Sequence, residues 1–177
     1  MKKSIYILVC LLFIAGQAAK AQLTSAEEVA TPELAAKREV LKKEVIGNYM
    51  AVKQALIVSD AVNTAKEAVK FIASLDQFKF KKLSLQDMNA ATSLRKEIKE
   101  LAMTISTTNN INEQRKAFSV LSEKIWIMAN KVKPQNGILY QQVCPMTGDT
   151  WLSMEKEIKN PYYPKNMLTC GEVKQSI

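Results

Sequence analysis

The chain has 177 residues, with 25 Lys and Arg, 17 Asp and Glu and no histidine, and its net charge is +8. The absence of histidine excludes Ser–His and Cys–His nucleophile pairs, the usual neutral-pH proton shuttle, and histidine-based zinc or copper sites. The sequence also has no glycine-rich phosphate loop and no Cys-x-x-Cys motif, so we do not expect an enzyme and assign no catalytic residue.

Residues 1–21 predict a secretory signal peptide. Lys2 and Lys3 precede an apolar run over residues 5–15, and Ala19-Lys20-Ala21 supplies an A-x-A cleavage site. The apolar run is shorter than the roughly 20 residues that a membrane-spanning helix needs. Cleavage after Ala21 would remove Cys10, so we expect an exported protein without a transmembrane segment, located in the periplasm.

The remaining chain carries a mild basic charge. Loss of the three leader lysines lowers the net charge from +8 to +5. The other lysines are scattered along the sequence, a pattern typical of solvated faces, and we expect no nucleic-acid partner. Residues 22–32 are expected to form an N-terminal linker.

Residues 33–133 predict four helices. This stretch has no proline, a single glycine at Gly47, and many helix-forming residues. Apolar residues recur at helical spacing in four groups that begin near Pro32, Ser59-Asp60, Ser84 and Asn110. Because each group has one apolar stripe to bury, the expected fold is all-α, an up-down four-helix bundle.

Residues 134–177 differ in composition, with four prolines and three glycines in 44 residues. Residues 137–143, GILYQQV, have a strand-like composition, and a turn and the aromatic Trp151 follow. We expect a loop-rich segment that could contain a short β-hairpin. Trp151, Tyr162 and Tyr163 offer enough apolar area to pack this segment on the bundle.

The sulfur-containing side chains of the C-terminal segment are the remaining candidates for a functional site. Cys144 is followed by Met146, and Met167 is followed by Cys170. Thiolates and thioethers are the soft ligands that select Cu(I) or Ag(I). These four residues are therefore the candidate metal ligands, with the cysteines as the stronger pair.

A disulfide is the competing interpretation. Two cysteines 26 positions apart in an exported chain can pair with each other, and closing that loop would stabilise the fold by roughly 3.5 kcal/mol. Unrelated free thiols are a third reading. The first two both require that Cys144 and Cys170 lie close together in space.

The C-terminal segment resembles a bacterial domain family of unknown function. The resemblance is carried by five short motifs within residues 144–171: Cys144-Pro145-Met146, Trp151-Leu152-Ser153, Glu157-Ile158, Asn160-Pro161-Tyr162 and Met167-Leu168-Thr169-Cys170-Gly171. It extends more loosely over the helical part. Members of that family are short exported proteins or C-terminal domains of periplasmic adaptor subunits of copper- and silver-type efflux pumps.

The resemblance implies a helical bundle with a metal-related role. Relatives often have histidine where this chain has Val143, so a site here would be purely sulfur-based. We therefore expect an exported Cu(I)- or Ag(I)-type binding protein, associated with periplasmic heavy-metal efflux or buffering. The alternative is a helical interaction module without metal, stapled by a Cys144–Cys170 disulfide.

Overall fold

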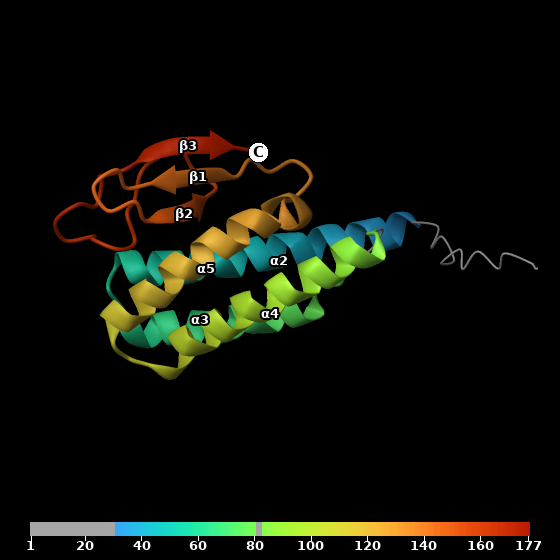
Figure 1. Ribbon diagram of the computed structural model, residues 1–177, viewed down its shortest axis with the longest axis horizontal. Helices are drawn as coiled ribbons and strands as arrows, with labels where there is room; N and C mark the ends of the chain where they lie inside the picture. The colour runs from blue at the N-terminus through green and yellow to red at the C-terminus, as the bar shows by residue number, and fades with distance from the viewer. Residues whose placement is uncertain (1–30, 81–82) are drawn as a thin grey trace, which may run out of the picture. The chain divides into compact units, whose positions relative to one another are not determined.

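A computed structural model describes residues 31–80 and 83–177. The predicted signal peptide, Cys10 and most of the predicted linker lie outside these described residues. The first part of the described chain forms four helices, namely α2 (Pro32–Ile57), α3 (Ala61–Gln77), α4 (Leu85–Thr107) and α5 (Ile111–Val132). Consecutive helices pack side by side and α2 also packs against α5, so the expected up-down bundle is confirmed (Figure 1).

Short polar residues begin three of the helices. The side chains of Asp60, Ser84 and Asn110 each accept a hydrogen bond from a backbone N–H of the first turn, at 2.9, 3.1 and 3.0 Å. The break after α2 lies at Ser59, which has a left-handed φ of 57°. The helix starts predicted from sequence are therefore confirmed for α3, α4 and α5.

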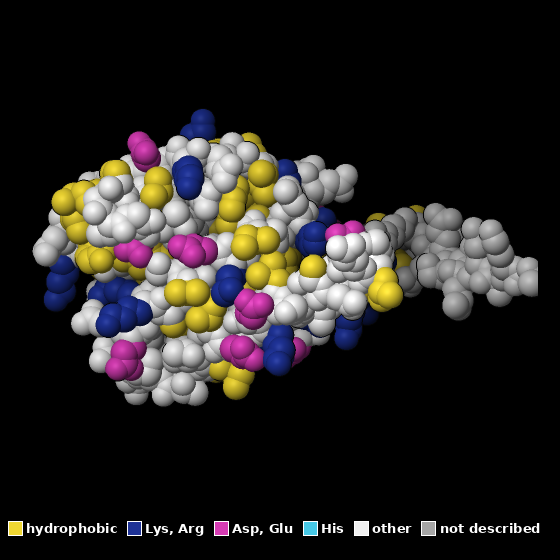
Figure 2. Space-filling model, viewed as in Figure 1, with side chains coloured by type: hydrophobic (Ala, Val, Ile, Leu, Met, Phe, Trp, Pro, Cys, Tyr) yellow, Lys and Arg dark blue, Asp and Glu magenta, His cyan; other side chains and the backbone are white. Residues whose placement is uncertain are grey.

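The bundle core is built from the apolar stripes predicted for α2, α4 and α5. The stripe predicted for α3, Val62, Ala65, Val69 and Ile72, is wrong, because Val62 and Val69 are exposed and Ala68, Phe71 and Leu75 are buried instead. Tyr49 stacks on Phe118, with ring centroids 5.0 Å apart, and meets Phe71 edge-on at 6.1 Å. The other fully buried large side chains of the helices include Ile46, Leu56, Leu75, Ile98, Ile105, Leu121, Ile125 and Met128. On the face seen in Figure 2, basic and acidic side chains are interspersed, as expected for solvated helix faces. None of the helices in the described ranges is long and apolar enough to cross a bilayer.

A three-stranded antiparallel sheet follows the bundle. Its strands are β1 (Tyr140–Val143), β2 (Thr150–Ser153) and β3 (Glu172–Ser176), in the order β2-β1-β3. β1 and β2 form the expected hairpin. The third strand was not predicted, because all of its residues are exposed and its sequence, EVKQS, has only one apolar residue.

Buried hydroxyl groups join the sheet to the bundle. The Tyr49 hydroxyl lies 2.7 Å from Ser122 Oγ and accepts the backbone N–H of Leu152 at 3.0 Å. The Tyr162 hydroxyl donates to the carbonyl oxygen of Thr150 at 2.6 Å. β2 is buried along its length and packs on α5, so this network holds β2, an edge strand of the sheet, against the helices.

Two of the three expected aromatic anchors serve as such. Trp151 is fully buried and Tyr162 is 5% exposed, and their rings meet edge-on at 6.0 Å. Tyr163 is 40% exposed, so its expected anchoring role is wrong. Tyr163 follows directly after Tyr162 in a bent loop, and only one of the two rings turns into the core.

Candidate metal centre

Cys144 lies directly after β1, where a tight turn begins. Its carbonyl oxygen accepts hydrogen bonds from the N–H groups of Thr147 and Gly148, at 3.3 and 2.8 Å, and its own N–H donates to the Asp149 carbonyl at 2.9 Å. Gly148 has a φ of +78°, which favours glycine. The turn therefore fixes the backbone on both sides of Cys144, whose side chain is fully buried.

Cys170 is positioned by a loop that Asn160 organises. The fully buried Asn160 side chain accepts the N–H groups of Tyr162 and Tyr163 at 2.9 and 3.3 Å, and it donates to the Cys170 carbonyl at 3.2 Å. The Asn160 backbone N–H donates to the Leu168 carbonyl at 2.7 Å. Sequence reasoning singled out Asn160 only within a motif. Its position before proline in a loop is a usable signal, since asparagine there commonly bonds to nearby backbone.

Gly171 allows the two cysteine segments to approach. A Cβ at this position would lie 2.8 Å from Trp151 Cη2, 2.9 Å from Ile158 Cγ2 and 3.1 Å from the Val143 carbonyl oxygen. Contacts under 3.0 Å require one of these neighbours to move, and all three are packed groups. Gly171 is thus a positioning residue that sequence reasoning quoted but did not explain.

The two thiols meet. Cys144 Sγ lies 3.4 Å from Cys170 Sγ, and both cysteines are free. A disulfide bond would bring the sulfurs to about 2.05 Å, so the thiols here are in hydrogen-bond contact. The spatial convergence that both sequence interpretations required is therefore present.

The environment favours one thiolate in the pair. Burial raises the pKa of Cys144, but hydrogen bonds to its sulfur from the Thr147 side chain, the Cys170 thiol and the N–H groups of Thr147 and Met146 outweigh burial and lower it overall. The hydrogen bond to Cys144, then burial and the charge on Cys144, raise the pKa of Cys170. These opposite shifts favour ionisation of Cys144 over ionisation of Cys170 within the pair.

The methionines are less closely engaged. Met146 is 75% exposed and Met167 is partly exposed. Within residues 31–80 and 83–177, neither thioether sulfur hydrogen-bonds to a thiol, and no group of three or more Cys, Asp or Glu side chains is placed to hold a metal. The fold brings the two cysteines together and leaves each methionine on the same segment as its cysteine.

Comparison with known proteins identifies a family. The family model described as "Protein of unknown function (DUF3347)" matches residues 45–137, just over half of the chain. The chain therefore belongs to this family. The matched region runs from the middle of α2 through the end of α5. No curated protein and no solved structure matches the chain.

Proposed function

We propose that this member of the DUF3347 family is an exported protein that binds a soft metal ion, Cu(I) or Ag(I), through Cys144 and Cys170. The observation that carries the proposal is the 3.4 Å approach of two free thiols from segments 26 residues apart. A histidine-free chain has few other strong ligands, and thiolate is the ligand that soft ions prefer.

The spacing of the two sulfurs suits a shared ion. Two thiolates about 2.3 Å from a tetrahedral ion lie roughly 3.8 Å apart, so a pair at 3.4 Å needs to open by only about 0.4 Å. The depressed pKa of Cys144 supplies the first thiolate. The partial exposure of Cys170 gives an ion a route to the buried Cys144.

Met146 and Met167 are proposed as weaker ligands. Each lies within three residues of a cysteine, and the exposed Met146 side chain has room to turn toward the thiols. Thioether ligands would bias the site toward Cu(I) over harder ions.

The proposed setting is the periplasm, near a heavy-metal efflux or buffering system. The N-terminal signal-peptide pattern and the resemblance of the C-terminal motifs to efflux-adaptor domains support this setting. In that role the ion is cargo, and the helical bundle is a rigid platform for the two cysteine segments.

A competition titration tests the proposal. The exported protein, reduced, is titrated with Cu(I) against a chromogenic Cu(I) chelator, beside Cys144→Ser, Cys170→Ser and the double variant. We expect the double variant to lose at least 100-fold in affinity, about 2.7 kcal/mol. Met128→Leu, which changes a methionine buried in the bundle core, is the matched control and should bind as the parent does. Equal affinity in the parent and the double variant would refute the proposal.

The second candidate is a helical interaction module stapled by a Cys144–Cys170 disulfide. The same 3.4 Å approach favours it, since oxidation needs only a local closure of the two sulfurs. Intact mass after alkylation, under non-reducing conditions, separates the candidates. A mass two protons lower, regardless of copper in the growth medium, favours the staple, whereas two alkylated thiols favour the metal site.

A further inference from the structure

An aromatic-floored groove lies at the end of the bundle away from the cysteines. It is formed by the start of α2, by residues 78–80 and Leu83 after α3, and by the end of α5, and has a volume of about 480 Å³. The cysteine-bearing loops instead approach the first half of α5, where Ser119 Oγ donates to Asp149 at 2.7 Å. The groove is therefore separate from the candidate metal centre.

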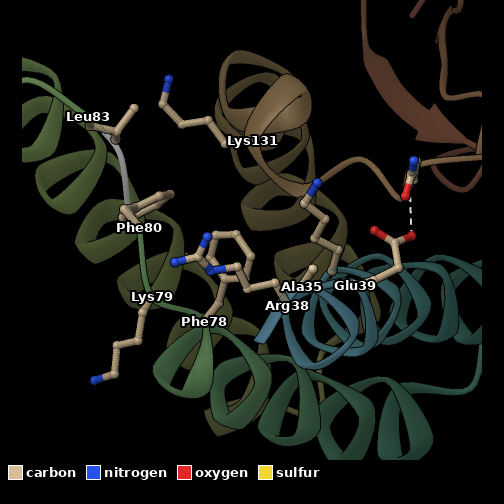
Figure 3. Close-up of a pocket in the computed structure, with 10 residues that line it drawn as sticks. Ala35, Arg38, Glu39, Phe78, Lys79, Phe80, Leu83 and Lys131 are labelled. Carbon is tan, nitrogen blue, oxygen red and sulfur yellow. Dashed lines mark hydrogen bonds between the residues drawn. The ribbon is translucent and has the colours of Figure 1, made fainter. Parts of the chain in front are cut away.

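The floor of the groove is held in place without a ligand. The rings of Phe78 and Phe80 meet edge-on, with centroids 5.4 Å apart. Arg95 donates to the Phe78 carbonyl at 2.7 Å, and its guanidinium lies 5.4 Å from the Phe80 centroid. Leu83 extends the apolar surface beside Phe80 (Figure 3). A floor fixed in this way loses little conformational freedom when a ligand binds.

The walls of the groove are positively charged. Among the described residues, Arg38, Lys42, Lys79 and Lys131 line it against one carboxylate, Glu39, which gives these side chains a net charge of +3. The Glu39 carboxylate already accepts a backbone N–H of the loop after α5 at 2.7 Å, the contact drawn in Figure 3. In the described part of the chain, Lys42 and Lys131 form no ion pair. These two lysines thus flank an apolar surface without an ion-pair partner among the described residues.

We propose that this groove binds an organic anion with an apolar body, of the fatty-acid class. The apolar body would lie on Leu83 and on the exposed edges of Phe78 and Phe80, which are 5% and 9% exposed, and the carboxylate would lie between Lys42 and Lys131. A volume of about 480 Å³ falls within the range typical of small-molecule sites. The apolar floor selects against small inorganic anions, and the lysines select against neutral lipids. This binding does not depend on the cysteines or on a metal.

Calorimetric titration with sodium octanoate tests the proposal. 1-Octanol represents the alkyl chain of the ligand without its carboxylate, and acetate represents the carboxylate without the alkyl chain. We expect octanoate to bind and the two fragments to bind at least 10-fold more weakly. Lys42→Ala and Lys131→Ala should each weaken octanoate binding roughly 10-fold, about 1.4 kcal/mol. Lys66→Ala removes an exposed lysine of α3 that does not line the groove and should leave binding unchanged.

Several results would overturn the proposal. These are no octanoate binding, acetate binding as strongly as octanoate, or equal losses in Lys66→Ala and Lys131→Ala. Binding to phosphatidylcholine–phosphatidylglycerol vesicles without binding to monomeric octanoate would also overturn it, because the basic side chains of the groove would then contact an anionic membrane surface.

Discussion

Replacing Gly171 with alanine should disturb the meeting of the two cysteine segments. The added methyl group would fall 2.8 Å from Trp151, 2.9 Å from Ile158 and 3.1 Å from the backbone oxygen of Val143. Trp151 is fully buried, and Val143 belongs to the central strand of the sheet. None of these groups is the free end of a flexible side chain, so the segment carrying Cys170 should move away from β1.

The cost follows from overpacking. Inserting one methyl group into a packed site typically destabilises a protein by about 1–3 kcal/mol. Because two contacts fall below 3.0 Å and the third is a backbone atom, we expect Gly171→Ala to lose about 2 kcal/mol of unfolding free energy. The same displacement should separate the thiols and slow the formation of an intramolecular disulfide under mild oxidation.

Urea denaturation, followed by tryptophan fluorescence, measures the effect. Gly47→Ala is the matched control, because Gly47 lies inside α2 and a Cβ there has no neighbour within 4 Å. That control should gain about 0.5–1 kcal/mol, since alanine favours a helix interior. If both variants change stability by the same amount and sign, the close-approach argument is incorrect.

Three further substitutions test the roles of Lys53, Tyr49 and Asn160. Burial lowers the pKa of Lys53 from 10.5 to about 8, so the folded state binds fewer protons between these values. The free energy of unfolding should then rise from pH 8 to 10. Lys53→Met should abolish this rise and stabilise the folded protein at pH 7 by up to roughly 3 kcal/mol. Parallel profiles of unfolding free energy against pH in the parent and the variant would contradict this. Tyr49→Phe should cost about 1–3 kcal/mol in urea, because the buried N–H of Leu152 loses its acceptor; an unchanged midpoint would contradict it. Asn160→Ala should make the Cys170 thiol react faster with a thiol reagent, because the loop loses its side-chain bonds; an unchanged rate would show that the loop holds without them.

The bundle was predictable because its signals are local. Helix periodicity, the proline-free stretch and the caps at Asp60, Ser84 and Asn110 all act within a few residues, and each is present in the fold. Strand β1 was predictable for the same reason. These features can be predicted without knowing which other segments the helices and the strand contact.

The rest depends on contacts between distant segments. Strand β3 has exposed, mostly polar residues and is a strand only because β1 offers a free edge. The roles of Gly171 and Asn160 appear only once the last loop is folded beside Trp151. The meeting of Cys144 and Cys170 was a requirement of both sequence interpretations, yet the sequence could not choose between a bond and an ion. The spacing between Cys144 and Met146 in the sequence did not predict that the Met146 side chain would be exposed.

The central claim is that the two converging thiols bind a soft metal ion. X-ray absorption at the copper edge, on the reduced protein loaded with one equivalent of Cu(I), tests it most directly. We predict a first coordination shell of sulfur atoms only, which is lost when Cys144 and Cys170 are both replaced by serine. A shell of oxygen or nitrogen atoms, or an identical spectrum from the double variant, would contradict it.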